Sequence, residues 1–519
     1  MPQFLYCKST KDKAICLFFA AFASILFAIV VNLVLFALYG PTTAGTWYNK
    51  YWSFFFAAIC FTLLSFYIFR NDFQEHPERP FFVIVLVFTC MASIAFDICE
   101  ISWDVGNHFR FMLSWTEPDL GLIADEAEAA EMHTAFGGPY TIADLNYWKN
   151  WLNDMSNLTS NAIVSDTYAH FYNKISSLPA SFVYFLCTAL GTSFTTKYVL
   201  AKLLYAIIYS VVVFLGMRCL HSGKMIFAAI ALMPIGLFLA ANYSYDYWVN
   251  AFLLYAMALL IRELQTPDTP LTLKRAVYIF LIFIVGCGPK AIYFPLAFLC
   301  ILMPRTKFSN SFNSRIYRAF CFIVPMLIAS TFMLSFITTG SEVGDSRGGS
   351  DVSSIGQVAH ILQDPIGFAQ ILITFLINDL LRSPMSIDHF AYLQHPMTPV
   401  WLISALLLLF TTFTDKNGYD IPATTWKSRT LTIIITFVTL CLVCSALYVS
   451  FTPVGLDTIN GVQHRYYIPL LFGFFYFLGS ARIGKKIRTH FKHYNFIALL
   501  LLSILPYITI WECYLIYVV

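Results

Sequence analysis

The dominant pattern along the chain is a series of long apolar runs separated by short polar segments. The runs at 14–38, 431–450 and 496–518 are almost uninterrupted, and about 20 such residues cross a bilayer core as a helix. Backbone groups inside lipid must be hydrogen-bonded within the segment, so each run predicts a transmembrane helix. The predicted spans are at about 14–38, 52–69, 81–98, 198–217, 225–241, 247–261, 319–337, 400–413, 430–450, 464–479 and 495–517.

Three further apolar pieces are short. The pieces at 276–287 and 291–303 are separated by Gly286-Cys-Gly-Pro-Lys290. Each is too short to span comfortably, so we expect a broken hairpin of two half-helices. The piece at 179–192 either spans or re-enters. Together these runs predict an all-α integral membrane protein, a bundle of about 12–14 transmembrane helices.

Two polar segments are too long to be simple connections between helices. The first covers about 97–178 and includes an amphipathic piece at 147–152. The second covers 338–399 and includes a predicted surface helix at 366–381. Long ordered loops on a rigid scaffold usually carry function. We therefore expect the chemistry of the protein in these segments.

The charges predict an orientation. Of the 32 Lys and Arg residues, 22 fall on one side of the predicted bundle, in the N-terminus, 70–80, 218–224, 262–275, 304–318, 415–429 and 480–494. Basic loops stay cytoplasmic, so we expect a multi-pass protein of the cytoplasmic membrane with a cytoplasmic N-terminus and both large loops outside. The net charge of +3 is too small to indicate a nucleic-acid partner.

Three carboxylates and a histidine fall within twelve positions at the outer end of the third span. If 97–112 is helical, Asp97, Glu100, Asp104 and His108 share one face. A carboxylate near lipid has a raised pKa and is suited to act as a general base. An ordinary solvated loop explains the same residues equally well.

Three later motifs lie at the same predicted face. Asn242-Tyr-Ser-Tyr-Asp246, followed by Asn250, could bind hydroxyl groups, although a plain polar turn is the simpler interpretation. Lys290 lies at membrane depth, where a charge indicates function unless the side chain reaches the interface. Arg465, in Gly461-Val-Gln-His-Arg-Tyr466, is suited to a lipid phosphate or to anchoring at the interface.

The chain lacks a Walker loop, a dinucleotide glycine motif, a metalloprotease helix and Cys/His zinc spacing. We therefore predict no cofactor and no metal.

Taken together, the motifs resemble a bacterial family long labelled a domain of unknown function and grouped with GT-C-type membrane glycosyltransferases. The resemblance covers about residues 81–480. It rests on Asp104-Val-Gly-Asn-His108, Pro234 with Ser244-Tyr-Asp246, Pro289-Lys-Ala-Ile-Tyr-Phe-Pro295 and Val462-Gln-His-Arg-Tyr466. The chain departs from the family pattern at Val105, where the family has an acid, at His464, where it has glycine, and in the order of Pro289 and Lys290.

The resemblance implies a GT-C-like core at 81–480, preceded by two additional helices in 1–80 and followed by a basic loop and last helix in 481–519. It implies transfer of a hexose, with inversion, from a polyprenyl-phosphate donor to a surface glycan outside the cell. A flippase for a lipid-linked saccharide and a glycan polymerase or ligase are the alternatives.

The roles expected on this basis are as follows. Asp104 is the general base with His108 beside it, and Lys290 and Arg465 bind the donor phosphate. The residues expected to bind sugar or acceptor are Asp97, Glu100, Asp246, Asn250, Gln463, His464 and Tyr466.

Overall fold

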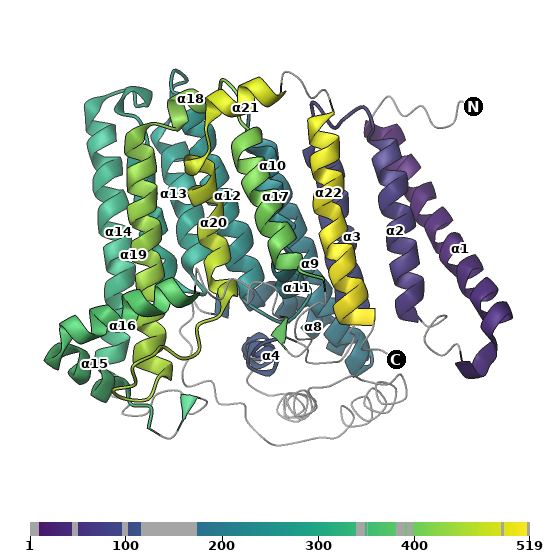
Figure 1. Ribbon diagram of the computed structural model, residues 1–519, viewed down its shortest axis with the longest axis horizontal. Coiled ribbons are helices and arrows are strands. Elements are labelled where there is room, and N and C mark those ends of the chain that lie inside the picture. The colour runs from purple at the N-terminus through teal and green to yellow at the C-terminus, as the bar shows by residue number, and fades with distance from the viewer. Residues whose placement is uncertain are drawn as a thin grey trace.

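A computed structural model describes residues 10–43, 50–95, 102–115, 174–338, 348–349, 351–379, 390–391, 398–488 and 493–515. Within these ranges the regular elements are all helical, which confirms the predicted all-α fold (Figure 1). The longer helices are α1 (Thr10–Thr43), α2 (Lys50–Ile68), α3 (Glu78–Ala95), α9 (Phe194–Cys219), α12 (Asp246–Gln265), α13 (Leu273–Cys287), α14 (Ser311–Thr338), α17 (Val400–Thr414), α19 (Trp426–Phe451) and α22 (Tyr494–Thr509).

Six of the described helices are long and apolar enough to cross a membrane, and this supports an integral membrane protein. They are Lys11–Leu38, Phe194–Cys219, Asp246–Gln265, Ser311–Ser330, Trp426–Phe451 and Tyr494–Glu512. A seventh span exists if α15 (Ser354–Gln363) and α16 (Pro365–Ile377) count as one, but their axes differ by 108°. The predicted total of 12–14 spans therefore stays a prediction.

Several predicted spans are shorter or broken in the structure. The run at 225–241, predicted as one helix, consists of α10 (Lys224–Ala231) and α11 (Pro234–Ala240). Pro234 has no N–H to donate and its ring clashes with the preceding turn, so a new helix begins there. The run at 464–479 begins as a 3₁₀ turn, η10 (His464–Tyr467), and continues as α20 (Ile468–Leu478).

The hairpin predicted at 276–303 is present as two different kinds of helix. The first is α13, and the second is a 3₁₀ helix, η4 (Ala291–Leu302), which packs against α13. The backbone N–H of Leu271 donates to the carbonyl of Lys307 at 2.7 Å, so the two open ends of the hairpin lie together. The turn that carries Lys290 is therefore at the opposite end.

The centre of the bundle is α12, which packs against α9, α13 and α20. Its described side chains are mostly buried, as are those of α10 and α11. Short helices lie at the two ends: α4 (Val105–Leu113), α8 (Leu178–Ala189), α15 and α16 at one end, and α18 (Asp420–Ala423) and α21 (Ala481–Arg488) at the other (Figure 1).

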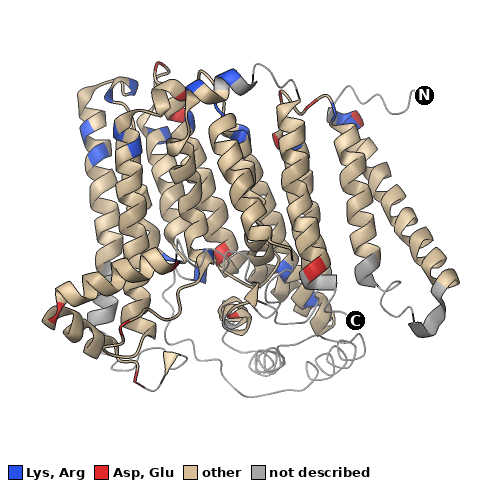
Figure 2. Cartoon of the chain, viewed as in Figure 1, with Lys and Arg blue, Asp and Glu red and all other residues tan. Residues whose placement is uncertain are grey.

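Lys and Arg gather at the end of the bundle that carries α18 and α21 (Figure 2). Few lie at the end that carries α4 and α16. The sequence segregates its basic loops in the same way. The bundle therefore has two chemically different ends, and the remaining charged motifs converge at the end that is poor in Lys and Arg.

Candidate functional site

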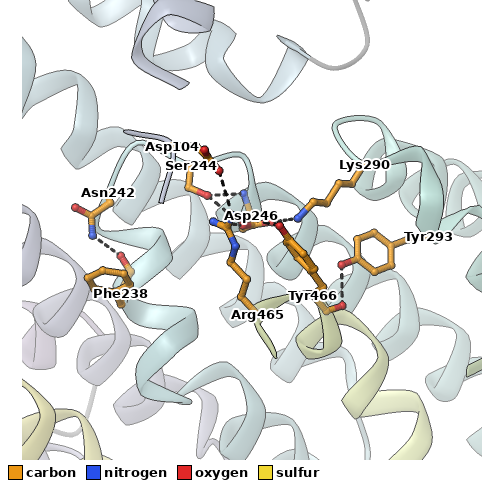
Figure 3. A network of polar contacts seen from close by, with 9 residues as sticks. All are labelled: Asp104, Phe238, Asn242, Ser244, Asp246, Lys290, Tyr293, Arg465 and Tyr466. Atoms are coloured by element: carbon orange, nitrogen blue, oxygen red, sulfur yellow. Dashed lines mark hydrogen bonds and ion pairs between the residues drawn. The ribbon is translucent and has the colours of Figure 1, made fainter. Parts of the chain in front are cut away.

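The site is centred on Asp246, the first residue of α12. A tight turn brings the chain from α11 into α12. In it, Asn242 Nδ2 donates to the carbonyl of Phe238 at 2.7 Å, and the backbone N–H of Asp246 donates to Ser244 Oγ at 3.0 Å (Figure 3). An acid is favoured at this position, because the N-terminus of a helix carries a partial positive charge. The Asp246 side chain is only 4% exposed.

Two cations bind the Asp246 carboxylate from opposite sides (Figure 3). Lys290 Nζ lies 2.9 Å from Oδ1, and Arg465 Nη1 lies 3.2 Å from Oδ2. Lys290 reaches the carboxylate because α13 ends at Cys287 and the chain turns before η4. Burying each of these charges costs several kcal/mol of folding free energy. Removing one partner would destabilise the protein by a similar amount, because the other charge would stay buried and uncompensated. The three charged side chains therefore depend on one another in the folded protein.

Asp104 completes the cluster from a fourth segment of the chain. Its Oδ2 lies 3.3 Å from Nη2 of Arg465, and its side chain is 29% exposed, whereas Arg465 is 2% exposed. The backbone of Asp104 has φ +57°, a left-handed conformation that is uncommon for residues other than glycine. Such strain concentrates at functional sites. The two acids and two bases cancel in charge, and Asp104 is the carboxylate that solvent or a substrate can reach.

Aromatic rings form the walls around the two cations. Lys290 Nζ lies 3.8 Å from the centroid of the Tyr466 ring, and Arg465 Cζ lies 4.7 Å from that of Trp103. Tyr293 Oη donates to the carbonyl of Tyr466 at 2.7 Å, which ties η10 to η4. Cation–π contacts in desolvated settings are worth about 2 kcal/mol. The rings therefore hold both cations in place beside Asp246.

Both cations retain donors that the cluster does not use. An ammonium has three N–H donors, and one hydrogen bond from Lys290, to Asp246, is formed within the described residues. Nε and Nη1 of Arg465 are buried without a hydrogen-bond partner there, since the geometry at Nη1 is that of an ion pair only. The cluster can therefore donate to an additional anion or hydroxyl group.

His108 lies on α4, against the edge of the Tyr245 ring, with the two ring centroids 4.4 Å apart. The pKa of His108 is lowered to about 4, chiefly by burial, with Asp104 and Asp246 opposing the shift and Arg465 and Lys290 adding to it. The imidazole is therefore neutral at pH 7. It lines a small cavity of about 10 Å³ together with Lys174, Ser176 and Ser244.

One expectation about this segment is wrong. Residues 97–112 do not form one helix, because residues 102–104 form a turn and α4 begins at Val105. Asp104 instead precedes the helix, and its carbonyl accepts from the backbone N–H of His108 at 3.0 Å. Asp97 and Glu100 lie outside the described residues.

The remaining predicted residues within the described part of the chain are Tyr466, Asn250, Gln463 and His464. Tyr466 lies beside Lys290, and Asn250 is buried one turn along α12 from Asp246. Asn250 Nδ2 and Gln463 Oε1 are both buried without a hydrogen-bond partner among the described residues. The side chain of His464 belongs to a different cluster, since its Nε2 lies 3.5 Å from the carboxylate of Asp379.

Four residues of the site region were not predicted: Trp103, Tyr245, Tyr293 and Asp379. The first three are adjacent to predicted residues or belong to the same motif, so an aromatic residue beside a buried cation is the signal that could have found them. Asp379 follows an apolar helix in a segment without a motif. No group of three or more His, Cys, Asp or Glu side chains that could hold a metal ion occurs in the described part of the chain.

Comparison with known proteins identifies a family. The family described as "Predicted membrane protein (DUF2142)" matches residues 142–474, which include Asp246, Lys290 and Arg465. No curated protein and no solved structure matches the chain. The match covers more than half of the sequence and agrees with the helical, apolar architecture. The chain therefore belongs to the DUF2142 family of predicted membrane proteins.

Proposed function

We propose that this protein is a membrane glycosyltransferase that moves a hexose from a polyprenyl-phosphate donor to a glycan hydroxyl group. The observation that carries the proposal is the pairing of an accessible carboxylate, Asp104, with a buried cationic pair. Arg465 lies 3.3 Å from Asp104 and shares Asp246 with Lys290. Transfer of a sugar from a phosphate needs both a base for the acceptor and positive charge for the leaving group.

The two cations are the proposed phosphate ligands. A phosphate leaving group gains charge as the glycosidic bond breaks, and donors in a water-poor site stabilise that charge. Lys290 has unused N–H donors, and Arg465 has two nitrogens without a hydrogen-bond partner among the described residues. Asp246 holds both side chains in place while the donor is absent.

Asp104 is the proposed general base. Asp246 is 4% exposed and bound by two cations, which leaves it poorly suited to accept a proton. Asp104 is 29% exposed and bound by one nitrogen of Arg465 at 3.3 Å. Asp104 directly precedes α4, which lies at the end of the bundle away from the basic loops (Figures 1 and 2). On the positive-inside rule this is the extracytoplasmic end.

The test is transfer by the purified protein from synthetic polyprenyl-phosphate hexoses, with donor binding measured separately. Asp104→Asn keeps the size of the side chain but cannot accept a proton. It should lower transfer by roughly 10²–10⁴-fold and leave donor binding unchanged. Lys290→Ala should instead weaken donor binding.

Asp268→Asn is the matched control, because Asp268 is exposed in the loop after α12. It should leave both measurements at the parental level. Transfer by Asp104→Asn within a few-fold of the parent would remove the base role. Donor binding without transfer by the parent would favour a flippase.

A further inference from the structure

A second polar cluster lies on the other face of η10. Tyr467 Oη donates to Asp379 Oδ2 at 2.5 Å, and His464 Nε2 is 3.5 Å from the same oxygen. A 3₁₀ helix has three residues per turn, so side chains three apart are eclipsed. His464 and Tyr467 therefore share the face toward Asp379, while Arg465 points to the ion cluster.

This cluster stands at the edge of a large apolar groove. The groove has a volume of about 240 Å³, and most of its wall comes from α19 and α20. Beside Asp379, His464 and Tyr467, its lining is mostly apolar and includes Met233, Leu471 and Phe475. Met233 contributes because the helix is broken between α10 and α11.

The length of the groove indicates an extended ligand. Its lining follows the chain from His464 to Phe475, which is roughly 20 Å at the rise per residue of 3₁₀ and α helices. The hydrocarbon core of a bilayer is about 30 Å thick. A ligand that fills this groove therefore has an apolar chain that reaches more than halfway across the core.

The polar edge indicates the headgroup of that ligand. The described residues that line the groove include one carboxylate, that of Asp379, and no Lys or Arg. Tyr467 and His464 use Oδ2 of Asp379, and no described residue donates to Oδ1. A carboxylate with a free oxygen accepts hydrogen bonds from hydroxyl groups, whereas it repels a phosphate.

We infer that this groove binds a lipid with a neutral, hydroxyl-bearing headgroup, such as a glycolipid, with its hydroxyl groups on Asp379. The inference extends and rests on the proposed function, in which this lipid is the acceptor. Asp379 contacts one face of η10 through His464 and Tyr467, and Arg465, the proposed phosphate ligand, extends from another face. The donor, which carries a phosphate, would lie on the Arg465 face.

The experiment compares two photoreactive probes that share one alkyl chain, dodecyl glucoside and dodecyl phosphate. The full-length protein is placed in phosphatidylcholine nanodiscs, and labelled peptides of α19, η10 and α20 are counted. A hydrogen bond from a hydroxyl group to the charged Asp379 favours the glucoside, so it should label these peptides about tenfold more strongly.

Two variants test the two parts of the groove independently. Asp379→Asn removes the charge and should abolish the preference for the glucoside. Leu471→Trp fills the groove and should remove labelling by both probes. Ile434→Trp is the control for added bulk, because Ile434 is 51% exposed on α19 outside the groove. It should label like the parent. Thermal unfolding checks that each variant is folded.

Equal or stronger labelling by the phosphate probe in the parent would overturn the inference and assign the groove to an anionic lipid. Unchanged labelling in folded Leu471→Trp would overturn the placement of the chain. The labelling needs no sugar donor. The inference can therefore fail while transfer is demonstrated, and it can hold while transfer is not found.

Discussion

At the scale of single residues, Asp246 is the side chain that compensates the charge of two buried cations. It is the carboxylate that Lys290 and Arg465 share, and all three side chains are at most 14% exposed. Removing one member of a buried ion pair leaves the other charge uncompensated. The stability of the fold and the arrangement of the site therefore depend on the same carboxylate.

Asp246→Asn should therefore destabilise the protein by about 3–5 kcal/mol. The reason is that Asn leaves the ammonium of Lys290 and the guanidinium of Arg465 buried with Asp104 as their remaining carboxylate neighbour. Thermal or denaturant unfolding in detergent measures the loss. Asp268→Asn, at an exposed position, should stay within about 0.5 kcal/mol of the parent. Equal stability of the two variants would contradict the central role of Asp246.

The burial of His108 predicts that the folded protein loses stability as the pH falls. In the unfolded chain its pKa is about 6.5, and in the folded protein burial lowers the pKa to about 4. Between these values the unfolded state binds a proton that the folded state does not, so stability is full above pH 6.5 and falls as the pH drops. The slope is at most about 1.4 kcal/mol per pH unit.

His108→Gln removes this titration. Unfolding temperatures measured from pH 7.5 to 4.5 should fall more steeply for the parent than for the variant. Parallel curves would show that His108 is not buried as a neutral side chain.

At the scale of elements, the two segments of the α13–η4 hairpin have similar lengths although they contain different numbers of residues. The 12 residues of η4 rise about 2.0 Å each in the 3₁₀ form, and the 15 residues of α13 rise about 1.5 Å each. Both segments therefore cover roughly 22–24 Å, although one has fewer residues. This match lets the turn place Lys290 beside Asp246.

The position of that turn depends on close packing between α12 and α13. A Cβ atom on Gly286 would lie 2.9 Å from two side-chain carbons of Leu253 and 3.1 Å from its backbone nitrogen. The backbone cannot move aside as a flexible side chain does. Gly286→Ala should therefore cost about 1–3 kcal/mol, despite the higher helix propensity of alanine.

The control for this change is Gly418→Ala. A Cβ atom on Gly418 would meet no atom within 4 Å. Unfolding should distinguish the two variants, and donor use should fall for Gly286→Ala alone. A Gly286→Ala protein as stable as the Gly418→Ala protein would show that the two helices are less tightly packed.

Most of these elements could be predicted from the apolar runs. The ends of α17, predicted at 400–413, lie at Val400 and Thr414, and those of α12 lie within a few residues of the prediction. The 3₁₀ form of η4 could not be predicted, because hydropathy measures how apolar a segment is and not which hydrogen bonds it forms. The turn before α4 depends on a left-handed residue, Asp104, for which the sequence has no glycine to signal it.

At the scale of the whole molecule, the two ends of the bundle differ in charge. Lys and Arg gather at the end with α18 and α21, and the ion cluster lies at the other end (Figure 2). On the positive-inside rule the basic end faces the cytoplasm. This orientation is a prediction that labelling can test.

Single cysteines at exposed positions of the two ends provide the test. Lys427 is exposed at the start of α19, and Gln363 is exposed at the end of α15. In intact cells, a maleimide that cannot cross membranes should label Gln363→Cys and should label Lys427→Cys only after permeabilisation. The parental protein gives the background from natural cysteines. The reverse pattern would invert the proposed topology.

The charged site could be predicted only as separate motifs. Asp104, Asp246, Lys290 and Arg465 were each recognisable from their neighbours in the sequence, and the structure brings them together. Their pairing could not be predicted, because it depends on how helices far apart in the sequence pack. Asp379 illustrates the limit, since its significance comes only from the groove and from the two η10 residues that contact it.

The four members of the ion cluster also leave the ribosome in a fixed order. Asp104 and Asp246 are synthesised first, Lys290 follows, and Arg465 comes 175 positions after Lys290. Until η10 is made, the cluster has one negative charge in excess, and it is neutral only when η10 docks. An uncompensated charge at a membrane edge is unfavourable. A nascent chain that stops before Arg465 therefore holds a carboxylate of the cluster that no cation of the cluster yet compensates.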